Sequence, residues 1–260
     1  MVLSSIIIPA RMASTRYPGK PLAQIAGRTM IERVWRIAKA VSCCRHVYIA
    51  TDDPGLKRFA ENFGAEVLLT SPDCLTGTDR VAEASEKLLE HEIFFSLQGD
   101  AVLTPPWVID DVLRAMLADP STQMATPAVR LMGKALADFA ETKKGGSSSG
   151  TTVVFDKNQN ALYFSKALLP FHRDIVSGDR PVYRHIGLYA YRKKTLLSLA
   201  RLPEGPLEKS EKLEQLRALE NGIPIRVVPV DYKGRTHGSV DRPEDVPFVE
   251  SIIAQEGELV

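Results

Sequence analysis

Apolar runs typical of buried strands alternate with helix-like segments along the first half of this 260-residue chain. The strand-like runs are residues 6–8, 46–51, 65–70 and 93–97. Residues 29–41 carry apolar side chains at helical spacing, and two more helices are expected to end near residues 63 and 90. Strands buried on both faces are typical of parallel sheets, so the alternation predicts an α/β fold with a mainly parallel, doubly wound sheet and helices on both faces.

Antiparallel strands are expected in the second half of the chain. Residues 152–156 and 160–164 have the pattern of a hairpin. Residues 184–191 alternate as one strand that turns His185 and Tyr189 to the same face. The remaining expected segments are strands 124–129 and 225–230, helices 208–219 and 243–253, and a mobile polar loop or linker at 143–150.

A cationic loop follows the first strand. Arg11, Arg16 and Lys20 lie among small residues and prolines, at the carboxyl end of a strand where open α/β sheets bind ligands. The arrangement predicts a polyphosphate site, and the alternative is a solvated basic surface loop.

Two aspartates stand where strands give way to polar segments. Asp100 follows the strand at 93–97, and Asp241 precedes the last predicted helix. A carboxylate facing a phosphate loop is suited to Mg²⁺, although Asp100 could equally cap the helix that starts near Pro106.

The charge balance excludes several classes of partner. Lys and Arg number 33 and Asp and Glu 32, so we expect no nucleic-acid binding and no attraction to an anionic membrane. No apolar run approaches the length of a membrane span, and no signal-peptide pattern is seen. Three cysteines without metal or redox spacing favour a cytoplasmic location.

Several short motifs are spread along the chain in a fixed order: IPAR (residues 8–11), YPGKPL (17–22), ATDD (50–53), GTDR (77–80), QGD (98–100), ALYFS (161–165), HIGLYAY (185–191), EKLEQLR (211–217), and VD followed by PED (240–241 and 243–245). Together they resemble the motifs of the 3-deoxy-manno-octulosonate (Kdo) cytidylyltransferases. The resemblance covers nearly the whole chain.

This resemblance implies a nucleotidyltransferase domain of the glycosyltransferase A type that uses CTP, a keto sugar acid and Mg²⁺, releases pyrophosphate and forms a homodimer. It implies one domain over residues 1–260. Residues 1–122 and 222–260 would form the nucleotide-binding core, and residues 123–221 would bind the acceptor and dimerise.

The resemblance also assigns roles to individual residues. The implied nucleotide-binding residues are Pro9, Ala10, Arg11, Ser14, Arg16, Lys20, Arg80 and Gln98. The implied acceptor-binding residues are Gln98, Arg173, His185, Tyr189, Glu214 and Gln215. Asp100 and Asp241 would hold Mg²⁺ and, with Lys20, carry catalysis. No side chain stands out as a general base, and activation of the attacking hydroxyl by the metal is preferred.

Three departures from the family pattern concern the acceptor side. Ala101-Val102 stands where the family has Glu-Pro, Lys166 replaces an arginine, and residues 143–152 are unlike the usual sequence. An 8-amino sugar acid and a small phosphonate are therefore alternative acceptors. A second alternative is that the protein binds the nucleotide without turnover. A dehydrogenase is a weaker alternative because the first loop lacks G-x-G-x-x-G.

Overall fold

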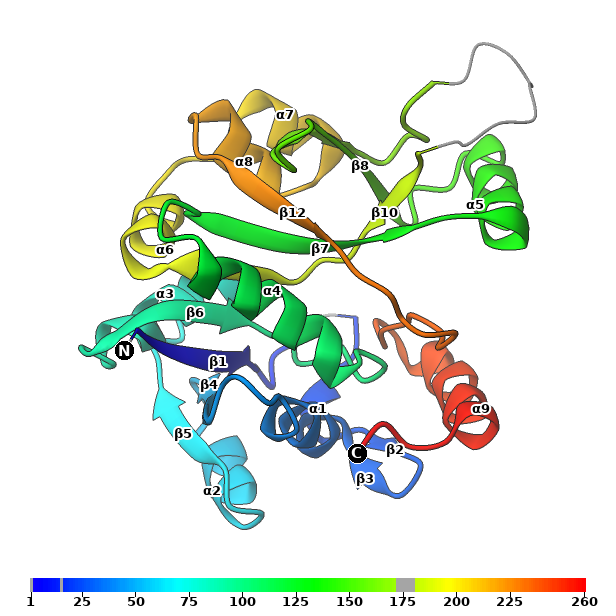
Figure 1. The fold of residues 1–260 in the computed structure, drawn as a ribbon. Helices are drawn as coiled ribbons and strands as arrows, with labels where there is room; N and C mark the ends of the chain where they lie inside the picture. The colour runs from blue at the N-terminus through cyan, green and yellow to red at the C-terminus, as the bar shows by residue number, and fades with distance from the viewer. Residues whose placement is uncertain (1, 15, 172–180) are drawn as a thin grey trace.

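The computed structural model describes residues 2–14, 16–171 and 181–260. Within these residues, one ten-stranded sheet has the order β5-β4-β1-β6-β11-β7-β10-β8-β9, and β12 pairs with β7 (Figure 1). The strands of this sheet are β1 (Leu3–Pro9), β4 (His46–Thr51), β5 (Glu66–Leu69), β6 (His91–Ser96), β7 (Met124–Arg130), β8 (Thr151–Phe155), β9 (Ala161–Ser165), β10 (Tyr183–His185), β11 (Tyr189–Arg192) and β12 (Ile225–Pro229). A separate hairpin joins β2 (Gln24–Ile25) to β3 (Arg28–Thr29).

The sheet is parallel through β5, β4, β1 and β6. Side chains alternate between its faces, so Ile6 and Ile8 enter one apolar core while Ile7 enters the other. This explains why the strands of the first half have unbroken apolar runs rather than alternating ones.

Helices cover both faces of the sheet. Apolar residues of α1 (Met30–Lys39), α2 (Pro54–Glu61), α4 (Pro106–Ala118) and α9 (Val246–Glu256) belong to the core that contains Ile6. Those of α3 (Gly77–Glu86), α6 (Lys193–Ala200) and α8 (Gln215–Glu220) belong to the core that contains Ile7. The predicted mixed α/β class, with a mainly parallel central sheet between helices, is confirmed, and the antiparallel strands continue the same sheet.

The predicted continuous strand at 184–191 is wrong, because the segment is broken into β10 and β11. Both lie along one edge of β7, at its opposite ends. Between them lies the partner position Pro127, which has no N–H to donate to a ladder. The Thr126 hydroxyl fills the gap: it lies 2.7 Å from the Leu188 carbonyl, to which it donates its one proton, and 3.3 Å from the Ile186 carbonyl.

The predicted helix at 208–219 is also wrong. The chain forms α7 (Pro206–Glu211) and α8, separated by Lys212, whose φ of 54° is left-handed. A buried ion pair joins the two helices, with Arg217 Nη2 2.6 Å from Glu208 Oε1. The break separates Glu211, at the end of α7, from Glu214 and Gln215 at the start of α8.

The predicted loop at 143–150 begins inside a helix, α5 (Gly133–Lys144), which has no buried residue. Lys143 Nζ donates to the carbonyls of Ser149 and Gly150, 2.7 and 2.8 Å away, and so closes the loop on itself. No helix among the described residues is both long enough and apolar enough to cross a membrane.

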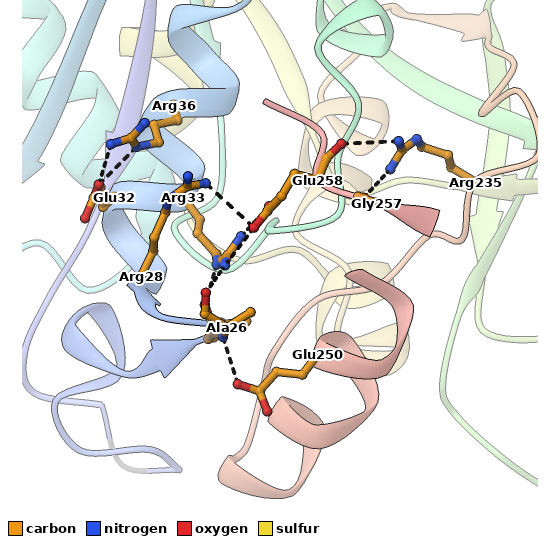
Figure 2. A network of polar contacts seen from close by, with 10 residues as sticks. Ala26, Arg28, Glu32, Arg33, Arg36, Arg235, Glu250, Gly257 and Glu258 are labelled. Atoms are coloured by element: carbon orange, nitrogen blue, oxygen red, sulfur yellow. Dashed lines mark hydrogen bonds and ion pairs between the residues drawn. The ribbon is translucent and has the colours of Figure 1, made fainter. Parts of the chain in front are cut away.

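A polar network fastens the end of the chain to its beginning (Figure 2). Arg33 of α1 is buried, and its guanidinium donates to the Ile25 carbonyl and to Glu258, 2.6 and 2.7 Å away. The Glu250 carboxylate of α9 accepts a hydrogen bond from the Ala26 backbone N–H at 2.8 Å. The hairpin of β2 and β3 and the helix α9 are therefore held together, although more than 200 residues separate Ala26 from Glu250.

Candidate active site

A cavity of about 250 Å³ opens at the carboxyl ends of β1 and β6, beside the first turn of α3. All of the predicted nucleotide-binding residues line it: Pro9, Ala10, Arg11, Ser14, Arg16, Lys20, Arg80 and Gln98. Asp100 lines the same cavity. The position combines the carboxyl edge of parallel strands with a helix amino terminus, and both favour anions.

The cationic loop is shaped by its own backbone. The N–H groups of Ser14 and Gly19 both donate to the Met12 carbonyl, at 2.9 and 3.1 Å. Gly19 has a φ of 69°, a conformation that favours glycine, and the short 3₁₀ helix η1 (Lys20–Leu22) starts immediately after it. This turn directs Lys20 back toward the end of β6.

Gly99 lets the loop after β6 pass close to the end of β1. A Cβ atom at this position would lie 3.0 Å from the Pro9 carbonyl oxygen, so a larger residue would force the two segments apart. The close approach holds Gln98 and Asp100 near the end of β1, where both line the cavity.

The four cations of the cavity have different partners. Lys20 Nζ is 2.5 Å from Asp100 Oδ2, and Arg11 donates to the Leu75 carbonyl at 3.3 Å. Arg16 Nη2 lies 3.3 Å from Asp241 Oδ1. Arg80 is buried under the cavity, and its guanidinium donates to the Thr70 hydroxyl and pairs with Asp52, 2.5 and 3.0 Å away. Arg11, Arg16 and Lys20 are thus better placed than Arg80 to contact an anion.

The two predicted metal ligands, Asp100 and Asp241, come from loops in direct contact. The Val240 N–H donates to the Asp100 carbonyl at 3.3 Å, and the Asp245 carboxylate accepts from the Asp241 N–H at 2.8 Å. The described residues contain no group of three or more His, Cys, Asp or Glu side chains suited to a metal. Two carboxylates beside an anion cavity fit Mg²⁺, which completes its shell with phosphate oxygens and water.

A second cavity of about 170 Å³ adjoins the first and shares Gly77 and Gln98 with it. Four of the predicted acceptor-binding residues line this second cavity: Gln98, Tyr189, Glu214 and Gln215. The break between α7 and α8 is what brings Glu214 and Gln215 there, since they occupy the cap and the first turn of α8.

The second cavity has polar side chains, and not all of them have a hydrogen-bond partner. Burial raises the pKa of the Glu214 carboxyl, while Thr78 and Arg217 oppose the shift. The side-chain nitrogen of Gln215 is buried and has no hydrogen-bond partner within the described residues. A buried donor without a partner is costly, so this amide favours a ligand that offers an oxygen.

His185 lies behind the cavity lining and not in it. The buried ring contacts Tyr189, with 5.5 Å between ring centroids, and Nε2 is 2.9 Å from the Thr126 hydroxyl. Burial lowers the pKa of His185 to about 3, with the positive charge of Lys166 adding to the effect. The imidazole is therefore neutral and supports the Tyr189 ring. Arg173 lies outside the described residues.

The departures from the family pattern have identifiable surroundings. Ala101 and Val102 are buried in the apolar core, so no acidic group stands next to Asp100 there. Glu211 accepts from the Ser165 hydroxyl and from the Lys166 N–H, at 2.6 and 2.8 Å. Burial lowers the pKa of Lys166, while the charges of Glu211 and Asp241 oppose this shift.

Thr78 and Tyr191 line the second cavity but were not predicted as site residues. The signal for Thr78 was its place in the GTDR motif, directly after Gly77. The signal for Tyr191 was its place at the end of the HIGLYAY motif, two residues after Tyr189.

Comparisons with known proteins agree with this geometry. The family model described as cytidylyltransferase matches residues 5–226. A 3-deoxy-manno-octulosonate cytidylyltransferase from Maricaulis maris is 54% identical over 255 residues, which are 98% of each chain. An 8-amino-3,8-dideoxy-manno-octulosonate cytidylyltransferase from Shewanella woodyi is 41% identical, over 96% of this chain and 98% of that protein.

Solved structures share the fold. A structure of CMP:2-keto-3-deoxy-manno-octonic acid synthetase complexed with CTP superimposes with a TM-score of 0.87 and 35% identity, over 98% of this chain and 99% of the other. A 4-diphosphocytidyl-2C-methyl-D-erythritol synthase from Anaerococcus prevotii has a TM-score of 0.60 at 13% identity, over 97% and 96% of the two chains, which indicates a shared fold.

Proposed function

The chain belongs to the 3-deoxy-manno-octulosonate cytidylyltransferase family, and from this premise we propose which of its residues bind CTP, the sugar acid and Mg²⁺. It is a CTP-dependent enzyme that activates a 2-keto-3-deoxy sugar acid, Kdo or a close analogue, to the CMP-sugar and releases pyrophosphate. The observation that carries the assignment of residues is the meeting of two cavities at Gly77 and Gln98. The cationic cavity suits the triphosphate, and the polar cavity suits a hydroxylated acid.

The nucleotide side of the site supplies fixed positive charge. Arg11, Arg16 and Lys20 would contact the phosphate oxygens, where Arg offers a fork of donors and Lys a point charge. As the anomeric hydroxyl attacks the α-phosphorus, negative charge moves onto the departing pyrophosphate. Cations already held in place by the loop stabilise that charge without rearranging.

We propose that Asp100 and Asp241 hold Mg²⁺. The support is the contact between their two loops and the room that two carboxylates leave for phosphate oxygens. Bound there, the ion would neutralise charge on the phosphates and polarise the attacking hydroxyl. Asp100 lines the cavity beside Lys20, and Asp241 is not among the lining residues but pairs with Arg16, which is.

The acceptor side would hold the sugar acid by hydrogen bonds with Gln98, Tyr189, Glu214 and Gln215. The unpartnered amide nitrogen of Gln215 supports this, since a sugar hydroxyl or carboxylate supplies the missing acceptor. The greater identity to the Kdo enzyme, 54% against 41% for the 8-amino enzyme, favours Kdo.

A pyrophosphate-release screen tests the proposal directly. The purified protein is incubated with Mg²⁺ and each of the four NTPs, against Kdo, 8-amino-Kdo and a small phosphonate. Release with CTP and Kdo, and a lower kcat/KM with 8-amino-Kdo, is expected. A higher kcat/KM with 8-amino-Kdo would reassign the acceptor, and no release with any acceptor would favour a nucleotide-binding protein without turnover.

We also propose that the protein is a homodimer and that it is located in the cytoplasm, because CTP is supplied there. The surface of α5 supports an interface, because it carries apolar residues yet buries none of them. Light scattering on a sizing column checks the association, and a single-chain mass would contradict it.

A further inference from the structure

Lys20 forms an ion pair with Asp100, one of the two carboxylates proposed to hold the metal. Its Nζ atom is 2.5 Å from Asp100 Oδ2, and the two side chains are only 16% and 26% exposed. The second pair at the site, Arg16 with Asp241, is longer at 3.3 Å and much more exposed, at 64% and 49%. Water screens exposed ion pairs, so the Lys20–Asp100 pair is expected to have the larger interaction free energy of the two.

An ammonium group and a divalent cation compete for one carboxylate. Both seek the same oxygen lone pairs, and two positive charges within a few ångströms repel each other in a partly buried cavity. Lys20 can give up Asp100 only if other oxygens accept its hydrogen bonds, since it has three donors and is largely out of water. The oxygens of a triphosphate in the same cavity meet that need.

We propose that Lys20 is a built-in counter-ion that keeps Asp100 neutralised until a nucleotide enters. The arriving phosphates accept the Lys20 donors and free Asp100, so metal and nucleotide bind cooperatively, and the metal alone binds weakly. The inference rests on the proposed function, because it takes Asp100 as a metal ligand. It adds a second role for Lys20 before any phosphate contact.

Binding of Mn²⁺, measured by electron paramagnetic resonance without nucleotide, tests the inference. Lys20→Met should bind Mn²⁺ at least about tenfold more tightly than the wild type, because the competing ammonium is gone. Arg11→Met is the matched control: Arg11 lines the same cavity, and in the described part of the chain it forms no ion pair. Its Mn²⁺ affinity should change less than about threefold.

When CTP is added without acceptor, the wild type should bind Mn²⁺ more tightly than Lys20→Met, the reverse of the order without nucleotide. CTP should tighten Mn²⁺ binding to the wild type and do so less for Lys20→Met, which has lost a phosphate contact. Thermal unfolding shows whether Lys20→Met is folded, and Lys20→Gln provides a second test of the same expectation. Equal Mn²⁺ affinity of wild type and both Lys20 variants without nucleotide would overturn the inference.

A double variant separates this inference from the proposed metal site. Lys20→Met with Asp100→Asn should lose the gained Mn²⁺ affinity. If the double variant keeps the tight binding, Asp100 is not the ligand, and the proposed site itself fails. If Lys20→Met gains nothing while Asp100→Asn weakens Mn²⁺ binding in the presence of CTP, only the counter-ion role of Lys20 fails.

Discussion

At the scale of single residues, His185 links the acceptor cavity to the stability of the fold. Its ring is enclosed by Phe164, Tyr189 and Thr126, and burial holds it neutral with a pKa of about 3. In the unfolded chain an ordinary histidine titrates near 6.5. Between these values the unfolded state binds more protons, so the stabilising contribution is lost as the pH falls below 6.5.

This predicts a pH dependence that can be removed by mutation. From pH 7 to pH 5, His185 should account for a loss on the order of 2 kcal/mol in the free energy of unfolding. His185→Gln, which keeps a side chain able to form hydrogen bonds but cannot titrate, should show a correspondingly smaller loss in urea unfolding at the two pH values. His46→Gln, at an exposed position, is the control. Equal losses in wild type and His185→Gln would contradict the assignment.

Asp241 offers a second residue-scale prediction. Replacing it by Asn removes a proposed metal ligand but keeps its size, so kcat/KM should fall by roughly 10²-fold or more. Glu244→Gln, three residues further along and exposed, should stay within about twofold, since exposed charges are screened. Steady-state pyrophosphate release measures both variants. Similar activity in the two would remove Asp241 from the metal site.

At the scale of elements, the break between α7 and α8 decides where the acceptor residues lie. Lys212 takes a left-handed conformation, which costs a non-glycine residue about 1 kcal/mol, and it is exposed. Lys212→Gly should therefore stabilise the protein by roughly 0.5–1 kcal/mol.

The matched variant lies three residues earlier, inside α7. Lys209→Gly should destabilise by a similar amount, because Lys209 is exposed and helical and glycine has more freedom to lose there. Urea unfolding of both variants gives the sign of each effect. A loss of stability in Lys212→Gly would mean that the break is not a strained position.

An element could be predicted from the sequence when its own residues determine it, and could not when residues of another element do. The strands β1, β4 and β6 were predictable because their apolar runs alone require burial on both faces. The break in the segment at 184–191 depends on Pro127 of another strand, and the break at Lys212 depends on a buried pair between Glu208 and Arg217. Neither partner is visible from the local pattern.

The same distinction applies to the site. The cationic loop predicted an anion cavity from composition and position, and the structure brings its three cations together there. The acceptor residues were named only through the family resemblance, since Tyr189 and Gln215 come from different elements. His185, expected beside them, supports Tyr189 from behind.

At the scale of the whole molecule, Arg33 joins the two ends of the chain. It is 5% exposed and donates to the carbonyls of Ile25 and Ala26 as well as to Glu258. The segments that it joins lead directly to Lys20 on one side and to Asp241 on the other, because β2 follows η1 and α9 follows η2 (Pro243–Asp245).

Arg33→Met should therefore lower the free energy of unfolding by roughly 2–4 kcal/mol, since the buried Ile25 carbonyl loses its donor and the Ala26 carbonyl and Glu258 lose theirs. Arg36→Met, which removes an exposed pair with Glu32 on the same helix, should cost less than about 0.5 kcal/mol. Chemical denaturation compares the two variants. Equal effects would mean that the network in Figure 2 adds little to the fold.

The sharing of Gln98 by both cavities has a thermodynamic consequence. A side chain fixed by one ligand is already ordered for the other, so the two binding events share a coupling free energy. Linkage makes this coupling reciprocal: the factor by which CTP tightens sugar binding must equal the factor by which the sugar tightens CTP binding. Any preferred order of binding is then set by the rates of entry into the two cavities.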